Sequence, residues 1–209
     1  MRATLITDGS SDVVLLPILR WLLDQLAVVP MDVQWADLRA LPRPPKTLTD
    51  RARVAMELYP CALLFVHRDA EGEPIERRLA EIEVAGAEVG PCVAVVPVRM
   101  QEAWLLHHEA ALRQAAGRPS GREPLDLPSW VRIESLPDPK AVLHQALRVA
   151  SGHHGRRLRS FDPARVAHYL ADLIDDWSPL RRLGAFQRLE RDMRAALIRL
   201  GVGLRFPDA

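Results

Sequence analysis

The stretch ALLFVHRDAEG, residues 62–72, decides the fold class because an apolar run of strand length gives way abruptly to charged residues. Residues 62–66 are apolar at every position, which is typical of a strand buried on both faces. The run ATLIT, residues 3–7, has the same form and stops at an Asp-Gly-Ser-Ser turn sequence. The run CVAVVPV, residues 92–98, is rich in β-branched residues, and its proline indicates a strand end or a bulge. These runs predict a parallel sheet that is covered on both faces.

Helical patterns separate the predicted strands. Apolar residues recur at helical spacing from Asp12 to Leu26, and helices are also expected over residues 47–58 and 74–85. A weaker strand is expected near residues 33–36. Strands that alternate with helices predict an α/β protein with a doubly wound, mostly parallel sheet.

The second half of the chain is predicted to be a helical extension. Helices are expected over residues 102–115, 139–150, 163–174 and 179–200, and the last three follow an Asp or Ser that stands directly before a proline. The basic segment around residues 153–159 is expected to be a loop. We therefore divide the chain into an α/β domain (residues 1–117), a proline-rich surface crossing (118–137) and a basic helical extension packed on the sheet domain (138–209).

Composition excludes several classes of protein. Of the 209 residues, 48% are hydrophobic and 26% are charged, a balance typical of a globular domain and not of a disordered or fibrous chain. No apolar stretch approaches the roughly 18 residues of a membrane helix, and the opening MRATLITDGSSD lacks a signal-peptide pattern. Cys61 and Cys92 have no CxxC spacing and are expected to be buried thiols. We therefore expect a cytoplasmic protein with no membrane association.

The net charge of +1 hides an uneven distribution. Residues 1–100 contain 11 basic and 14 acidic groups, whereas residues 151–209 contain 11 basic and 7 acidic groups. An acidic N-terminal half and a basic C-terminal segment are compatible with a metal site beside a phosphate-binding surface, although chance also produces a charge excess of this size. In the same way, the basic segment with Arg156, Arg157 and Arg159 is either a phosphate contact or a solvated loop.

Acidic residues follow three of the predicted strands. Asp8 and Asp12 follow the first strand, Asp69 and Glu71 follow the run at 62–66, and Glu102 follows the last. Parallel strands end at a common edge where ligands bind, and carboxylates there suit Mg²⁺ or Mn²⁺, which activate water and neutralise phosphoryl charge. The alternative is that these residues are ordinary turn and first-turn acids that happen to share an edge.

The spacing of these acids resembles that of the TOPRIM domain, the metal-binding fold of topoisomerases, primases and OLD-type nucleases. That family usually has Glu-Gly in its first motif and Asp-x-Asp in its second, where this chain has Asp8-Gly9 and Asp69-x-Glu71. Both departures keep a carboxylate, but Asp8 is shorter than the usual glutamate. The resemblance implies a TOPRIM, Rossmann-like fold with a magnesium or manganese site.

A second segment is similar to one branch of this superfamily. The sequence PVRMQEAWLLHH, residues 97–108, resembles the Phe-Glu-x-x-Leu-Leu segment of DUF4276 and RloB-like proteins, which places Glu102 in the acidic site. The sequence SPLR, ending at Arg181, loosely resembles a Ser/Arg motif near the end of DUF4276 proteins. Relatives in this branch are often encoded beside ABC- or SMC-like ATPases in antiviral defence systems, which implies an ATPase partner. The resemblance is convincing over residues 1–110 and weak beyond them.

These observations predict a divalent-metal-dependent, TOPRIM nuclease-like protein that acts on DNA or RNA phosphodiesters within a defence complex. One alternative is a catalytically silent TOPRIM subunit that binds an ABC- or SMC-like ATPase or an effector; another is a small-molecule phosphohydrolase. Lys140 either contacts the scissile phosphate or is solvated, and Arg68 either binds phosphate or balances the acids. The expected catalytic residues are Asp8, Asp69, Glu71, Glu102 and Lys140; the metal ligands are Asp8, Asp12, Asp69, Glu71 and Glu102; and the nucleic-acid contacts are Arg68, Arg156, Arg157, Arg159 and Arg181.

Overall fold

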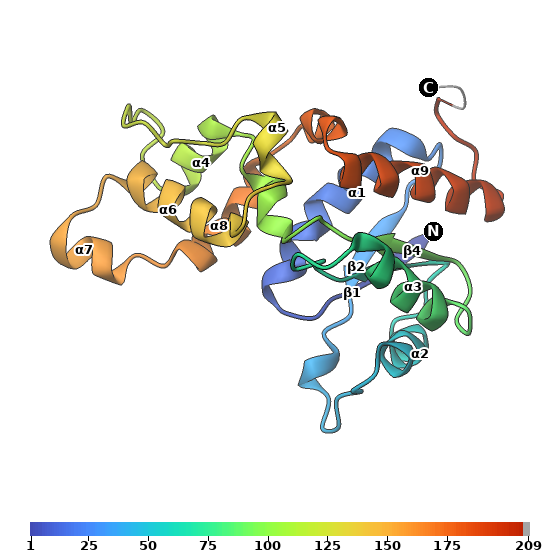
Figure 1. The fold of residues 1–209 in the computed structure, drawn as a ribbon. Coiled ribbons are helices and arrows are strands. Elements are labelled where there is room, and N and C mark those ends of the chain that lie inside the picture. The colour runs from blue at the N-terminus through green and yellow to red at the C-terminus, as the bar shows by residue number, and fades with distance from the viewer. Residues whose placement is uncertain (207–209) are drawn as a thin grey trace.

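The computed structural model describes residues 1–206 and contains a parallel four-stranded sheet (Figure 1). Its strands are β1 (Arg2–Ile6), β2 (Asp32–Trp35), β3 (Leu63–His67) and β4 (Cys92–Val95), in the spatial order β2-β1-β3-β4. Every neighbouring pair is parallel. The doubly wound α/β fold expected from the sequence is thus confirmed.

Helices cover both faces of the sheet, and alternate strand residues point into two separate cores. Helices α1 (Leu15–Leu26) and α9 (Gly184–Arg199) share one core with strand residues such as Leu5 and Phe65. Helices α2 (Leu48–Leu58) and α3 (Ile75–Gly86) cover the opposite face. Strands buried on both sides explain why the runs in the sequence are apolar at every position.

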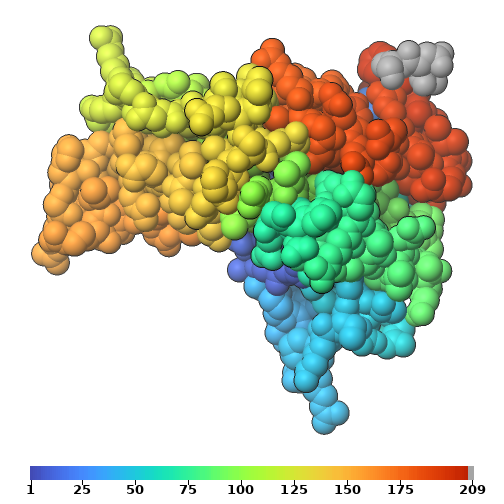
Figure 2. Space-filling model, viewed as in Figure 1, coloured from blue at the N-terminus to red at the C-terminus, as the bar shows by residue number. Residues whose placement is uncertain are grey.

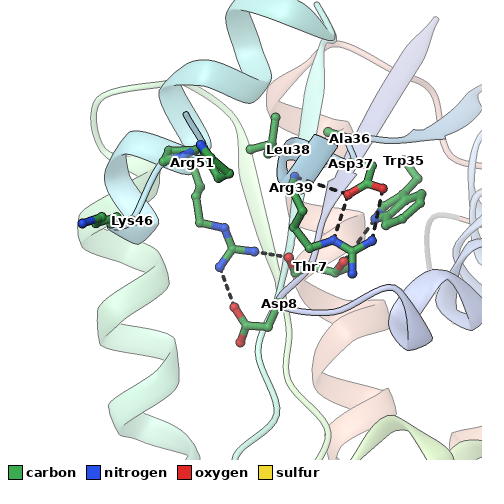
Figure 3. Close-up of a pocket in the computed structure, with 11 residues that line it drawn as sticks. Thr7, Asp8, Trp35, Ala36, Asp37, Leu38, Arg39, Lys46 and Arg51 are labelled. Carbon is green, nitrogen blue, oxygen red and sulfur yellow. Dashed lines mark hydrogen bonds and ion pairs between the residues drawn. The ribbon is translucent and has the colours of Figure 1, made fainter. Parts of the chain in front are cut away.

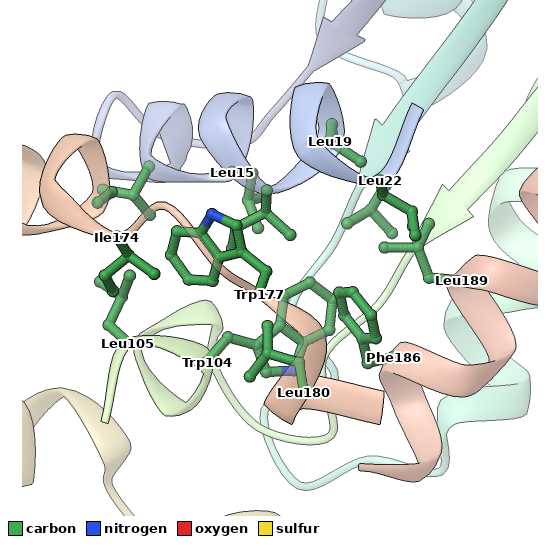
Figure 4. Close-up of a cluster of buried hydrophobic side chains, with 14 of the residues drawn as sticks. Leu15, Leu19, Leu22, Trp104, Leu105, Ile174, Trp177, Leu180, Phe186 and Leu189 are labelled. Atoms are coloured by element: carbon green, nitrogen blue, oxygen red, sulfur yellow. The ribbon is translucent and has the colours of Figure 1, made fainter. Parts of the chain in front are cut away.

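The remaining helices form a lobe that extends from one end of the sheet (Figures 1 and 2). The hydrophobic core runs without interruption from the sheet into this lobe, because Trp104, Trp177 and Phe186 pack with leucines of α1 (Figure 4). The Trp104 and Phe186 rings meet edge to face with their centroids 5.7 Å apart. The lobe contains α4 (Glu109–Ala115), α5 (Trp130–Ile133), α6 (Pro139–Ser151), α7 (Gly155–Ser160) and α8 (Pro163–Leu173).

Several helices differ from their expected bounds. The helix expected from Asp12 begins with a 3-10 turn, η1 (Ser11–Val14). The helix expected over 102–115 is split into η3 (Gln101–Leu105) and α4, because the ring of His108 caps α4 by accepting a hydrogen bond from the Ala111 amide. The helix expected over 179–200 is likewise divided, into η4 (Ser178–Arg182) and α9, by the extended backbone of Leu183.

Further differences concern the strand ends, the caps and the cysteines. β4 ends at Val95, two residues before the proline that cannot donate to the ladder. Asp138 and Asp162 cap α6 and α8 as expected, but Ser178 is the first residue of η4 and not its cap. The expected basic loop at 153–159 is largely helix α7, and the segment 118–137 contains the short helix α5. A short 3-10 helix, η2 (Leu38–Ala40), follows β2. Cys61 and Cys92 are half-buried, whereas the sequence predicted buried thiols. Within residues 1–206, every helix is too short or too polar to span a membrane.

Candidate acidic site at the carboxyl edge of the sheet

The candidate site lies where the connections of the sheet change direction. After β1 the chain crosses to β2 on one side, and it then returns to β3 on the other side of β1. In open α/β sheets, such a switch point leaves a crevice at the carboxyl ends of the two central strands, where ligands bind. Asp12 lies in the turn region after β1, and Asp69 lies two residues after β3.

Gln101 ties these two carboxylates together. Asp12 is buried; its Oδ2 accepts a hydrogen bond from the Gly9 amide (2.8 Å), and its Oδ1 accepts one from Gln101 Nε2 (3.0 Å). The backbone amide of Gln101 donates to Asp69 Oδ1 (3.1 Å). One residue of η3 therefore sets the positions of acids from two different strand ends.

His67, the last residue of β3, completes the buried floor of the site. Its Nδ1 lies 2.9 Å from the carbonyl oxygen of Val95, which only accepts, so Nδ1 carries the proton. Its Nε2 faces Asp69 Oδ1 at 3.4 Å and Asp12 Oδ2 at 3.9 Å. Burial lowers the pKa of His67 and thereby favours the uncharged imidazole. With its proton on Nδ1, the ring presents a lone pair at Nε2, which accepts a hydrogen bond from Asp69 only when that carboxyl group is protonated.

The carboxylates of Asp12, Asp69 and Glu102 repel one another. Burial and, after it, the charges of Glu102 and Asp12 raise the pKa of Asp69 to about 8. Glu102 is buried, and its Oε1 lies 3.5 Å from Nζ of Lys140 on α6. Gln101 Oε1 is also buried, without a hydrogen-bond partner in the described part of the chain. The site therefore holds an excess of oxygen acceptors and negative charge.

Asp8 and Glu71 lie outside this buried group. Asp8 is 47% exposed and forms ion pairs with Arg51 (2.5 Å) and Arg68 (2.8 Å). Glu71 has a positive φ of 54° and is 65% exposed, with Arg78 3.6 Å away. The structure thus brings together Asp12, Asp69 and Glu102 of the five expected metal ligands.

A basic cavity of about 170 Å³ lies on the far side of Asp8 (Figure 3). Arg51 reaches from α2 to Asp8 and also donates to the carbonyl oxygen of Thr7. The guanidinium of Arg39 lies 5.4 Å from the centre of the Trp35 ring, and Lys46 lines the same cavity. A site that binds phosphate needs such cations close to its acidic centre.

The expected nucleic-acid contacts are spread over the molecule. Arg68 lies beside Asp8, whereas Arg181 stacks on the ring of Trp21 and pairs with Glu190. The remaining three are exposed on α7, which lies at the end of the lobe far from the sheet (Figure 1): Arg156, Arg157 and Arg159.

Sequence reasoning missed two kinds of residue in this site. His67 and Gln101 were within its reach, because one ends a predicted strand and the other directly precedes Glu102. The cations Arg39, Lys46 and Arg51 lie in a loop or on a helix with no motif, so only the folded chain places them beside Asp8. A search for polar residues at the ends of predicted strands would therefore find His67 and Gln101, but it would not find the three cations.

The donor set fits a hard divalent cation in kind. Carboxylate and amide oxygens are the ligands preferred by Mg²⁺ and Mn²⁺, and the unpartnered Gln101 Oε1 is one such donor. Within residues 1–206, however, no three His, Cys, Asp or Glu side chains are already arranged around a common point for a metal. Binding would therefore require the buried side chains to move toward a shared ion.

Comparisons with protein-family models, with curated proteins and with solved structures found no match to this chain.

Proposed function

We propose that this protein is a divalent-metal-dependent, TOPRIM nuclease-like protein that acts on DNA or RNA phosphodiesters, in a defence complex with an ABC- or SMC-like ATPase. The observation that carries the proposal is the group of Asp12, Asp69 and Glu102 at the switch point, in which Asp12 and Glu102 are buried and Asp69 is half-buried. Burial, together with the charges of Glu102 and Asp12, raises the pKa of Asp69 to about 8, and a carboxyl whose pKa is raised by burial and by neighbouring charges in a crevice is typical of functional sites.

Each residue of the site has a distinct part in this proposal. Asp12, Asp69 and Glu102 would hold Mg²⁺ or Mn²⁺ with the amide oxygen of Gln101, and the bound cation would activate water and offset phosphoryl charge. His67 lies against Asp12 and Asp69 at the base of the site, with its Nδ1 anchored on the carbonyl oxygen of Val95.

Cations at the rim bind the substrate in this proposal. Lys140, next to Glu102, contacts the phosphate under attack, since its ammonium group is a compact point charge. Neighbouring phosphates of the backbone are held by Arg51 and Lys46, which line the cavity beside Asp8, and by Arg68, which pairs with Asp8.

The first experiment measures the melting temperature of the wild type and of Asp69→Asn and Glu102→Gln, with and without Mn²⁺. A ligand that binds only the folded state adds roughly 2.7 kcal/mol at a hundred times its dissociation constant, or about 5–10 °C for a chain of this length. We expect this shift in the wild type and its loss in both variants. The matched control is Glu71→Gln, which removes the same charge from an exposed neighbour and should keep the shift.

A cleavage assay then separates binding from activity. With Mn²⁺ present, the wild type should cleave a fluorophore-quencher oligonucleotide of DNA or RNA, and Asp69→Asn should not. The assay is repeated with any ABC- or SMC-like ATPase that the neighbouring genes encode. The metal site would be contradicted if the melting temperature did not change at Mn²⁺ concentrations up to about a hundred times the roughly millimolar dissociation constants of weak cation sites.

The second candidate function is a catalytically silent TOPRIM subunit that binds an ATPase or effector. Two observations favour it: Asp8 is held by two arginines, and the described residues include no ready-made group of three metal ligands. Under this alternative, Mn²⁺ leaves the melting temperature unchanged, and the ATPase binds wild type and Asp69→Asn equally well.

A further inference from the structure

A groove at the outer end of the lobe has a different chemistry from the acidic site. It has a volume of about 440 Å³, lies between α7 and α8, and is lined by basic and aromatic side chains. These include His153, Arg157, Phe161, Arg165 and Tyr169. These residues come from the part of the chain that carries the basic excess, so the groove attracts an anionic ligand.

The arginines at this groove have no internal partners. Elsewhere arginines commonly pair with a carboxylate, as Arg181 does with Glu190. In the described chain, by contrast, no ion pair or side-chain hydrogen bond involves the guanidinium groups of Arg157 and Arg165, which line the groove, or those of Arg156 and Arg159, which lie on α7. The acid that lines the groove, Asp162, is occupied in capping α8, where its Oδ1 accepts from the Ala164 and Arg165 amides. The groove thus presents uncompensated positive charge to solvent.

An exposed aromatic ring stands among these charges. Tyr169 is 53% exposed and lines the groove. Beside it, His153 and Phe161 pack edge to face with their centroids 5.8 Å apart. Proteins bind single strands by stacking bases on exposed aromatic rings while cations hold the phosphates. A duplex keeps its bases stacked inside and cannot use the ring.

Two cations on α6, Lys140 and Arg148, lie on one side of the helix, and Lys140 reaches the acidic site. They flank His144, which is four residues from each of them. Lys140 contacts Glu102 at 3.5 Å, and the charges of Lys140 and Arg148 add to burial in lowering the pKa of His144. A strand held in the groove would therefore follow positive charge to the carboxylates.

We infer that the groove between α7 and α8 binds single-stranded nucleic acid, with a base stacked on Tyr169 and phosphates on Arg157 and Arg165. This inference rests on the proposed function in taking nucleic acid as the ligand, and it adds the strandedness of the substrate and a second contact point. The groove holds the strand while Asp12, Asp69 and Glu102 act on it.

The test is the fluorescence anisotropy of a labelled oligothymidine of about 12 nucleotides, titrated in EDTA between about 50 and 200 mM salt. Tyr169→Ala should weaken binding about tenfold without changing the salt dependence, and Tyr169→Phe should restore it. Arg157→Gln/Arg165→Gln should reduce the slope of log affinity against log salt by about 1.4, or 0.7 per phosphate contact. The matched control Arg2→Gln/Arg199→Gln removes two exposed arginines outside the groove and should bind like the wild type.

Three results would overturn the inference. They are unchanged affinity in Tyr169→Ala, equal affinity for a duplex of the same length, and equal competition by polyglutamate, which would make the groove a general anion surface. Because the titration contains no metal, it is independent of the Mn²⁺ shift and the cleavage assay. If the wild type cleaves nucleic acid but Tyr169→Ala binds the oligonucleotide as tightly as the wild type, only this inference is contradicted. If Tyr169→Ala weakens binding but the wild type shows no Mn²⁺ shift, only the proposed metal site is contradicted.

Discussion

At the scale of single residues, Asp69 combines burial with the negative charges of three neighbours, of which Glu71 contributes least, and both effects raise its pKa, to about 8. An unfolded aspartate has a pKa near 3.9, so between about pH 4 and pH 8 the folded state holds a proton that the unfolded state has lost. The free energy of unfolding contributed by this group is therefore greatest below pH 4 and falls as the pH rises to 8.

Asp69→Asn should remove this dependence on pH. Without metal, the variant should be more stable than the wild type at pH 9, by at least about 1 kcal/mol, and closer to it at pH 5. Urea denaturation at the two pH values measures the difference. The exposed Glu71→Gln serves as control, and an identical pH slope in wild type and Asp69→Asn would show that Asp69 is ionised in the folded protein at neutral pH.

Gln101 is the second residue whose environment permits a sharp prediction. Gln101→Met keeps the size of the side chain but removes the donor to Asp12 Oδ1, so a buried carboxylate loses one hydrogen bond. We expect the free energy of unfolding to fall by about 1–3 kcal/mol in denaturant titrations. Gln145→Met, at an exposed position of α6, should change it by less than about 0.5 kcal/mol. Equal stability of the two variants would mean that water replaces the lost donor.

At the scale of elements, α3 presses closely against β4. A Cβ atom on Gly86 would lie 2.9 Å from Cys92 Cβ, so this helix end approaches the strand as only glycine allows. Gly86→Ala should lower the free energy of unfolding by about 1–3 kcal/mol, although alanine is the better helix former. In the matched control Gly184→Ala, at the start of α9, the nearest atom would be 3.6 Å away, and the change should be neutral or stabilising. Thermal or chemical denaturation of both variants distinguishes close packing from helix propensity.

At the scale of the whole molecule, one hydrophobic core joins the sheet and the helical lobe. Phe186→Ala, which deletes a fully buried ring against Trp104, should lower the free energy of unfolding by about 3–5 kcal/mol. Because that core is shared, tryptophan fluorescence and far-ultraviolet circular dichroism should report one coincident transition. Phe206→Ala, at a ring that is 61% exposed, is the control and should have little effect. Two separate transitions would show that sheet and lobe unfold independently.

Much of the fold could be predicted from the sequence because its signals are local. The apolar run at 62–66 became β3, the Asp-Pro pairs became the capped starts of α6 and α8, and strands alternating with helices became a parallel sheet. The breaks at His108 and Leu183 were missed, since a histidine cap and one extended residue leave no strong trace in the hydrophobic pattern.

The sequence by itself determined that acids follow three buried strands, because the chain direction in a parallel sheet places those strand ends at one edge. Only the tertiary structure decided which acids act together. Asp12, Asp69 and Glu102 lie beside Gln101, whereas Asp8 pairs with Arg51 and Arg68, and Glu71 lies beside Arg78. Arg51 is 43 residues from Asp8 along the chain, so the position of Asp8 depends on packing and charge in three dimensions and not on any local spacing.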